Sequence, residues 1–463
     1  MTSALKTISP VDGSIYVERS FADETDIASA LTQAVRAAEV WREVSIEERA
    51  ALCGRAIDAM VAEKDPIAKE ITWQMGRPIR YAAGEVNGLE ERARHMIAVA
   101  PDAIRDTQAE QKNGFTRFIR HQALGVVFVI APWNYPFLTS VNTIIPALMA
   151  GNTVILKHSG QTPLAAERYA EAFAAAGLPT GVFQFLHLDH AATERIIKDA
   201  QVNFVAFTGS VPGGEMVEAA AAGRFIGVGL ELGGKDPAYV RADADIAYAV
   251  ENLVDGAFFN SGQSCCGIER IYVDGAVYDD FIDGFTDLAG QYVLGNPTDP
   301  ETTLGPMVRA GAADFVRAQI GAAVKSGAKA LIDPGTFPAD APGTPYMAPQ
   351  VLINVNHEMA VMTEESFGPV VGIMKVTSDD QAVELMNNSR FGLTASVWTT
   401  DDGAALGIGD RIATGTWFQN RCDYLDPALA WTGVKQSGRG CTLSAMGYDS
   451  LTRPKSFHLK TKI

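Results

Sequence analysis

Two adjacent cysteines, Cys265 and Cys266, follow a Gly-Gln-Ser segment in the stretch FFNSGQSCCGIER at residues 258–270. Neighbouring cysteines rarely reach disulfide geometry without strain, so we do not expect them to bridge each other. A cysteine thiolate is a strong nucleophile, and one member of the pair is therefore a candidate for covalent catalysis. Such chemistry also needs a base and donors for an oxyanion, which other parts of the chain must supply.

Two other short stretches carry side chains suited to those roles. APWNYP at 131–136 holds Asn134 between aromatic residues and two prolines, and an amide fixed in this way can donate to a developing oxyanion. GLELGGKDP at 229–237 places Glu231 between two leucines, where burial would raise the pKa of a carboxyl group and suit it to act as a base. Taken alone, each residue has a simpler alternative: a turn asparagine, and a glutamate facing solvent at a strand end.

A candidate phosphate site follows the apolar run VNFVAF. Thr208-Gly209-Ser210 and Gly213-Gly214 come next, before a segment with helical character. A strand, a glycine turn and a helix N-terminus together offer backbone N–H groups to a phosphate. Neither the GxGxxG fingerprint nor the Lys-Ser/Thr of a nucleoside-triphosphate loop is present here, so a simple tight turn remains an equal alternative.

The overall composition narrows the classes of function. A chain of 463 residues is long enough for two or three domains, and its net charge of −17 disfavours nucleic acid and anionic membranes as partners. The start, MTSALKTISP, has no apolar region typical of a secretion signal, and five scattered cysteines form no disulfide framework, so we expect a cytoplasmic protein. The only close histidine pair, His187 and His190, has no further ligands nearby in sequence, and we expect no metal site.

The order of apolar runs predicts an α/β fold. Residues 23–75 have helical periodicity, and Asn113-Gly114 indicates a β-hairpin whose strands need support from another subunit. From residue 125, the short runs GVVFVIAP, TVILK, VFQFL and VNFVAF alternate with helical stretches, which is typical of βαβ units and a parallel sheet. A second αβ region follows at about 232–430.

Seven stretches in register resemble one known family. They are PWNYP, the lysine of VILK, FTGS, LELGGK, NSGQSCC, EESFGPV and GVKQSG. In order and spacing, the chain resembles the NAD(P)-dependent aldehyde dehydrogenase superfamily over essentially its full length. A histidine directly after the VILK lysine is similar to a subgroup that includes short succinate-semialdehyde dehydrogenases.

The resemblance implies a role for each matching residue. The family motif N-x-G-Q-x-C puts the nucleophile at Cys265 and leaves Cys266 a bystander. Glu231 becomes the base for deacylation, and Asn134 forms the oxyanion hole with the backbone N–H of Cys265. The implied coenzyme is NAD or NADP, with Lys157 at the adenosine ribose, Ser210 at the pyrophosphate, Glu365 at the nicotinamide ribose and Phe367 near the nicotinamide. The further coenzyme-site residues are Trp133, Ser159, Gly160, Gly209, Gly214 and Leu232.

The implied substrate is a small-molecule aldehyde in a tunnel whose walls include the variable stretch RCDYLDPALAW at 421–431. Aromatic walls suit a hydrophobic or aromatic aldehyde, whereas Arg421 could pair with the carboxylate of a semialdehyde. An ion pair of Arg421 with Asp423 or Asp426 is the structural alternative. The candidate wall residues are Tyr135, Leu138, Asn142, Phe259, Arg421, Tyr424, Leu425 and Trp431.

Two departures from the family pattern affect these expectations. The segment Lys157-His158-Ser159-Gly160 lacks the glutamate that usually meets the adenosine ribose, so we expect use of both NAD and NADP, with a second cation from His158 if it faces the ribose. Near the end, Gly440 is followed by Cys441-Thr442 instead of Arg-Glu. That change puts local packing in doubt.

The resemblance also implies the architecture. A Rossmann-like coenzyme domain would comprise 1–106 and 125–231, and an α/β catalytic domain 232–440. An oligomerisation arm would comprise 107–124 and 441–463, giving a homodimer or homotetramer. A CoA-acylating enzyme and a catalytically silent scaffold are the alternatives, and the intact Cys265, Glu231 and Asn134 argue against both.

Overall fold

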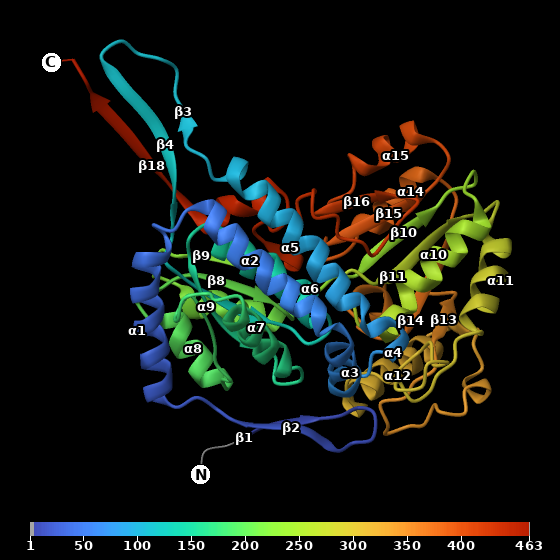
Figure 1. The fold of residues 1–463 in the computed structure, drawn as a ribbon. Coiled ribbons are helices and arrows are strands. Elements are labelled where there is room, and N and C mark those ends of the chain that lie inside the picture. The colour runs from blue at the N-terminus through green and yellow to red at the C-terminus, as the bar shows by residue number, and fades with distance from the viewer. Residues whose placement is uncertain (1–3, 463) are drawn as a thin grey trace.

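The computed structural model describes residues 4–462. The chain forms two open sheets flanked by helices, and a narrow arm projects from this body (Figure 1). None of the helices in this part of the chain is long and apolar enough to cross a membrane.

The first sheet has six strands in the spatial order β17-β9-β8-β5-β6-β7. Only β17 is antiparallel to its neighbour; the other five strands run parallel. The chain passes from β5 to β6 and β7 on one side and then returns to β8 and β9 on the other, so the strand order reverses between β5 and β8. Ligands of such sheets bind beyond the carboxyl ends of the strands at this switch point. The bounds are β5 Val126–Ala131, β6 Thr153–His158, β7 Phe183–Phe185, β8 Val202–Thr208, β9 Gly227–Glu231 and β17 Gly438–Arg439.

Helices cover both faces of this sheet, which explains why its strands are continuous apolar runs. Along β5, Val127 and Val129 pack into one core, while Val126 and Phe128 pack into the core on the opposite face. The first core includes α2 Ile46–Ala62, α3 Lys64–Met75, α5 Gly84–Ala103, α6 Pro136–Met149 and α7 Leu164–Ala175. The second includes α1 Glu24–Trp41, α8 His190–Lys198 and α9 Val211–Ala221.

The second sheet has seven strands in the order β12-β13-β14-β11-β10-β15-β16 and is parallel except for β12. Its strands are β10 Asp236–Val240, β11 Ile268–Asp274, β12 Lys329–Ala330, β13 Gln350–Ile353, β14 Val370–Val376, β15 Thr394–Trp398 and β16 Thr416–Gln419. The helices of this half are α10 Ile246–Phe258, α11 Tyr278–Ala289, α12 Ala310–Lys325, α13 Ala360–Thr363, α14 Asp379–Asn387 and α15 Asp402–Gly409. The expected α/β class is confirmed, and the second αβ region forms a further, mostly parallel sheet.

The arm differs from the expected hairpin. The Asn113-Gly114 turn is present, with Gly114 at φ +81°, but the strand before it, β3 Thr107–Gln108, has only two residues. The main partner of β4 Phe115–Ala123 is the C-terminal strand β18 Thr452–Lys460, which pairs with it along its whole length. The arm is therefore a three-stranded sheet that joins distant parts of the chain (Figure 1).

The tail between Gly440 and β18 belongs to the body. Tyr448 is fully buried and its hydroxyl donates to the carbonyl oxygen of Met96 in α5 at 2.6 Å. The segment before it also returns to the first sheet, because β17 pairs with β9 at Glu231. Residues near 440 thus contribute to the first sheet, although most of 232–430 builds the second one.

Candidate active site

The cysteine pair lies on a loop with an unusual backbone. After α10, the residues Asn260, Ser261 and Gly262 have φ angles of +54°, +58° and +70°. A side chain at Gly262 could not be accommodated, because its Cβ would lie 2.2 Å from the carbonyl oxygen of Gly368. Position 262 of this loop therefore requires glycine.

Buried polar side chains fix this loop in place. The Gln263 amide donates to the Asn260 carbonyl at 3.0 Å and accepts from the Val308 N–H at 2.8 Å. Ser261 donates to the Gly305 carbonyl at 2.7 Å, and Arg77 donates to Asn260 Oδ1 at 3.1 Å. The motif residues before Cys265 therefore act as supports that aim the cysteine.

Two cavities meet at Cys265 and Glu231, which alone among residues 4–462 line both of them. One cavity, of about 530 Å³, lies at the switch point of the first sheet, beyond the ends of β5 and β8. The other, of about 250 Å³, lies between α5, α6 and the loop at 423–431. A reactive thiol at this junction can meet one molecule from each side.

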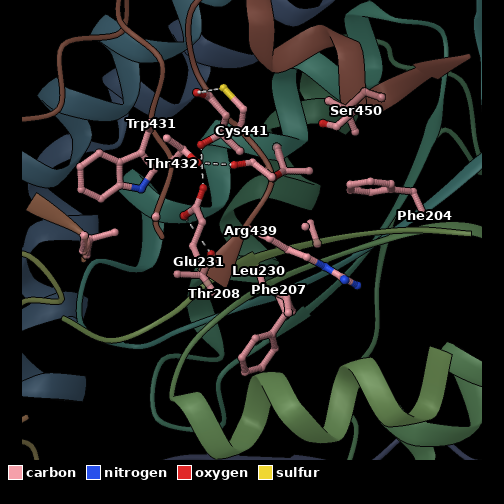
Figure 2. A pocket seen from close by; sticks show the side chains of 18 residues that line it. Phe204, Phe207, Thr208, Leu230, Glu231, Trp431, Thr432, Arg439, Cys441 and Ser450 are labelled. Atoms are coloured by element: carbon pink, nitrogen blue, oxygen red, sulfur yellow. Dashed lines mark hydrogen bonds between the residues drawn. The ribbon is translucent and has the colours of Figure 1, made fainter. Parts of the chain in front are cut away.

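Glu231, the last residue of β9, is held by two threonine hydroxyls (Figure 2). Thr442 donates to Oε1 at 2.6 Å and Thr208 donates to Oε2 at 3.2 Å. Burial raises the pKa of the carboxyl group, and the two hydroxyls act in the opposite direction. Thr442 comes from the tail segment that departs from the family pattern, so this departure places a hydroxyl directly on the predicted base.

Asn134 is buried directly after β5 and its backbone is fixed by hydrogen bonds. Its carbonyl accepts from Arg77 at 2.7 Å and from the Asn260 amide at 3.2 Å. One N–H of its side chain donates to the Gln263 carbonyl at 3.2 Å. Since a side-chain amide has two N–H groups, the second remains for a ligand in the cavity that Asn134 lines.

Most residues predicted for the coenzyme lie around the larger cavity. Trp133 and Phe367 meet edge to face with ring centroids 5.7 Å apart, and Glu365 accepts from the Gly234 N–H at 3.0 Å. Burial raises the pKa of Glu365 to about 8. The predicted residues in this wall are Trp133, Asn134, Gly209, Ser210, Glu231, Leu232, Cys265, Glu365 and Phe367.

A buried ion pair supports the loop that carries Glu365 and Phe367. Lys235 Nζ lies 2.5 Å from Glu269 Oε2, and both side chains are buried. The same carboxylate accepts from the N–H groups of Ser366 and Phe367 at 2.8 and 2.9 Å. The lysine of LELGGK and Glu269 therefore position the 365–367 loop, a role that we did not predict from the sequence.

Four predicted coenzyme residues lie outside the wall of this cavity. Lys157, Ser159 and Gly160 are at the end of β6, the strand next to β5. Gly214 lies in α9, where a Cβ would come within 2.7 Å of the Leu232 side chain. Close packing of α9 against Leu232 therefore requires this glycine.

His158 does not face the expected ribose position. It is buried, with Nε2 3.0 Å from the Pro136 carbonyl and Nδ1 3.2 Å from the Thr162 hydroxyl. Burial lowers its pKa to about 4, so it is neutral at pH 7. The suggestion of a second cation beside Lys157 was wrong, because this imidazole anchors the start of α6 instead.

The smaller cavity gathers seven of the eight predicted substrate residues. Arg421 is the exception: it is exposed, and its guanidinium lies 3.7 Å from the ring centroid of Tyr424. The alternative ion pair of Arg421, with Asp423 or Asp426, is not found among the described residues. The seven are Tyr135, Leu138, Asn142, Phe259, Tyr424, Leu425 and Trp431.

Cys266 differs from its neighbour in its surroundings. It is buried, and its thiol donates to Asp423 Oδ1 at 3.0 Å. The hydrogen bond with Cys265 and burial hold its pKa well above the usual range. Cys265 is partly exposed at the junction of the cavities, and all five cysteines are unpaired.

Known proteins are similar to this chain over nearly its whole length. The sequence profile described as aldehyde dehydrogenase family matches residues 1–457. The chain belongs to the aldehyde dehydrogenase family. A relative from Mycobacterium tuberculosis, named succinate-semialdehyde dehydrogenase (NADP+) 1, is 35% identical over 451 residues, covering 96% of this chain and 97% of that protein.

Solved structures show the same fold. A succinic semialdehyde dehydrogenase from Streptococcus pyogenes in complex with NADP+ has a TM-score of 0.94 and 28% identity, covering 98% of this chain and 99% of that one. The enzyme PnpE in complex with nicotinamide adenine dinucleotide has a TM-score of 0.95 and 30% identity, covering all of this chain and 95% of that one.

The donor set of this aldehyde dehydrogenase fits NAD or NADP. Ser210 is the N-cap of α9 and lines the cavity, so the positive end of the helix is available to a phosphate. Glu365 offers a carboxylate for a ribose, and Trp133 and Phe367 offer flat apolar surfaces.

Several residues of the site were missed in the sequence. Glu91 and Arg92 lie on α5, and Arg77 precedes the short helix α4 Ile79–Ala82. We assigned no function to these segments, and Asp423 was considered only as a partner of Arg421. Single charged residues on a helix carry no motif. Their place beside Cys265 depends on how α5 packs against α6, which the local sequence does not reveal.

Proposed function

We propose that this protein oxidises an aldehyde to the carboxylic acid with NAD(P)+, through a covalent bond to Cys265, and releases the acid by hydrolysis. The observation that supports this most directly is the position of Cys265 and Glu231 at the junction of the two cavities. The larger cavity takes the coenzyme and the smaller one takes the aldehyde.

Cys265 forms the first bond. Its sulfur attacks the aldehyde carbon, and the carbonyl oxygen gains negative charge in the thiohemiacetal. The free N–H of Asn134 and the backbone N–H of Cys265 stabilise this oxygen. Removing one donor of this kind typically costs about 2.7–4 kcal/mol of activation free energy.

A bound NAD(P)+ would supply the hydride acceptor that oxidation of the thiohemiacetal carbon requires. Glu365 and Phe367, held by the buried Lys235–Glu269 pair, orient the nicotinamide end. The carbon is then a thioester of Cys265.

Glu231 completes the reaction. Its carboxylate takes a proton from water, the resulting hydroxide adds to the thioester, and the Cys265 thiolate leaves. The raised pKa suits the group to proton transfer near neutral pH. This base also favours hydrolysis over transfer of the acyl group to CoA.

The substrate class and assembly are part of the proposal. The mycobacterial relatives support a semialdehyde, while the aromatic side chains in the smaller cavity support an aromatic aldehyde. The projecting β4–β18 arm supports a homodimer or homotetramer, and five unpaired thiols suit a reducing compartment such as the cytoplasm.

The test follows NADH or NADPH formation with a panel of aldehydes, with and without CoA. We expect free acid as the product and no acceleration by CoA. Glu231→Gln should lower turnover about 10²–10⁴-fold, the range for loss of a general base, without weakening coenzyme binding. Glu218→Gln, an exposed glutamate of α9, is the control.

The pH profile tests the same residue. Because burial raises the pKa of Glu231, its carboxylate takes up a proton at a higher pH than an exposed glutamate does. As the pH falls through that raised pKa, the base is lost and kcat should fall. Glu231→Gln should lack this acid limb. CoA-dependent turnover, or normal turnover of Glu231→Gln, would contradict hydrolysis through Glu231.

A further inference from the structure

The smaller cavity contains a buried arginine that makes no direct contact with a carboxylate of the described chain. Arg92, on α5, lines the cavity and is only 8% exposed. Its Nη1 donates to the Leu138 carbonyl at 2.6 Å and to Asn142 Oδ1 at 3.3 Å. Among residues 4–462, no carboxylate lies within 4.0 Å of its guanidinium, and Nε and Nη2 have no hydrogen-bond partner. Burial lowers the pKa of Arg92, and the nearby acids Glu85 and Glu231 act in the opposite direction. A buried charge in this state is costly unless an anion can reach it.

Arg77, the other arginine of this wall, shows the contrast. It donates to Asn260 Oδ1 and to the Asn134 carbonyl, and its Nη1 lies 3.6 Å from Glu85 Oε1. Its guanidinium also lies 4.4 Å from the centre of the Tyr135 ring. Arg77 is therefore occupied in supporting the nucleophile loop, whereas Arg92 has donors to spare.

Asn142 supplies a second unused donor at the same place. It is 2% exposed and lines the cavity, and its Nδ2 has no hydrogen-bond partner. Arginine can only donate, so the amide must turn Oδ1 toward Arg92 and Nδ2 away from it. A buried amide nitrogen without a partner is costly. Nδ2 has almost no accessible surface, so the amide must turn slightly for a ligand oxygen to reach it.

The acids in and beside this cavity would repel a bound anion, but burial raises the pKa of several of them. Burial raises the pKa of Glu231, and it raises that of Asp423 to about 7, so Asp423 carries less negative charge at neutral pH than an exposed carboxylate. Glu85 is closest to Arg77, and its pKa is also raised by burial. Glu91 accepts from the Tyr424 hydroxyl at 2.8 Å.

We propose that Arg92 and Asn142 form a subsite for a carboxylate group on the substrate, so that the protein selects aldehydes that carry a negative charge remote from the reacting carbon. This inference rests on the proposed function, because the aldehyde must occupy the smaller cavity. It replaces Arg421, which is outside that cavity, as the residue that would recognise a semialdehyde. One guanidinium and one amide N–H suit the two oxygens of a carboxylate.

The experiment compares matched pairs of aldehydes with and without a carboxylate: succinate semialdehyde against butanal, and 4-carboxybenzaldehyde against benzaldehyde. We expect wild type to favour the charged member of at least one pair in kcat/KM. Arg92→Leu should lower kcat/KM for that aldehyde about 10- to 100-fold, mainly through KM, and should change the neutral aldehyde little. Arg92→Lys, which keeps the charge, should restore part of the preference, and Asn142→Ala should reduce it severalfold.

The control is Arg94→Leu, since Arg94 is on the same helix but is exposed and paired with Glu90 and Asp58. Arg94→Leu should show the same preference for charged over neutral aldehydes as wild type. Equal kcat/KM for charged and neutral aldehydes in wild type, or an unchanged preference in both Arg92→Leu and Asn142→Ala, would overturn the subsite. If Arg92→Leu lowers kcat/KM equally for charged and neutral aldehydes, the substitution has disturbed the fold. Arg92→Lys and Asn142→Ala then decide whether the subsite exists.

A binding measurement separates this inference from the proposed function. Succinate and benzoate should slow the alkylation of Cys265 by iodoacetamide in wild type but not in Arg92→Leu. If no aldehyde is oxidised, the proposed function fails, and protection by these acids still reports the subsite. If aldehydes are oxidised but neither acid protects Cys265, the subsite alone is wrong.

Discussion

Cys265 and Cys266 are neighbours in the chain, but their sulfur atoms meet different surroundings. Cys265 faces both cavities, while the Cys266 thiol is buried and donates to Asp423. A thiol that donates to a carboxylate keeps its proton, and only a thiolate is an effective nucleophile. The geometry therefore favours Cys265, in agreement with the motif spacing.

The first prediction separates the two cysteines. Cys265→Ala should abolish aldehyde oxidation, because no other thiol reaches the junction of the cavities. Cys266→Ala should keep most activity, and Cys266→Ser, which retains a donor to Asp423, should match or exceed it. Steady-state rates and the site of iodoacetamide labelling provide the measurements. Activity in Cys265→Ala, or its loss in both Cys266 variants, would reverse the assignment.

The residue types around these cysteines were predictable where a motif carries them. Asn134, Glu231 and Cys265 each lie in a short pattern whose spacing reflects local backbone demands, such as the left-handed turn before Gln263. Arg92 and Thr442 could not be found in this way. Their importance arises from helix packing and from a tail that returns to β9, which are contacts between segments distant in sequence.

At the scale of elements, the apolar strands were the most predictable part. Strands buried on both faces are continuous apolar runs, so β5, β6, β7 and β8 were identified at nearly their observed positions. The arm was less predictable, because β4 finds its main partner in β18, more than 300 residues later. Neither strand has a sequence feature that specifies the other.

The end of β6 determines the second prediction, which concerns the coenzyme. Gly160 leaves no carboxylate beside Lys157, and Lys157 has no acidic partner within 4.0 Å in the described chain. A Cβ at Gly160 would lie 3.5 Å from Leu5, an ordinary contact, so a longer side chain can be introduced there. With His158 neutral, Lys157 alone would attract a 2′-phosphate, and we expect use of both NAD and NADP.

Gly160→Glu should therefore lower kcat/KM for NADP much more than for NAD, because the carboxylate repels the 2′-phosphate and accepts from the ribose hydroxyls. Gly160→Gln is the matched neutral control and should change the ratio less. The measurement is kcat/KM for both coenzymes with one good aldehyde. A wild-type preference for NAD beyond about a thousandfold, roughly 4 kcal/mol, would show that another group guards the ribose.

At the scale of the whole molecule, charge is unevenly distributed. The segments 107–124 and 452–462, which build the arm, contain seven Lys and Arg but only one Asp or Glu, although the complete chain has 38 basic and 55 acidic residues. The arm that these segments build is therefore basic, and the rest of the chain is strongly acidic. The arm also exposes apolar side chains, including Ile119 at 37% and Leu459 at 49%.

An exposed β-ribbon with free edges and apolar side chains is marginally stable and prone to aggregation unless another surface covers it. Because the arm and the body carry opposite charge, the acidic body of a second copy is a complementary surface, and this complementarity should steer association. Light scattering should therefore give a dimer or tetramer for wild type and a smaller species for the double variant Ile119→Asp, Leu459→Asp. Val40→Asp, at a 68% exposed position of α1, is the control and should retain the wild-type mass. Added salt should slow reassembly after dilution, because it weakens the attraction between the basic arm and the acidic body. The electrostatic screening length is roughly 8 Å at physiological ionic strength and shortens as salt is added. A monomeric wild type, or an unchanged mass in the double variant, would exclude the arm as the oligomerisation element.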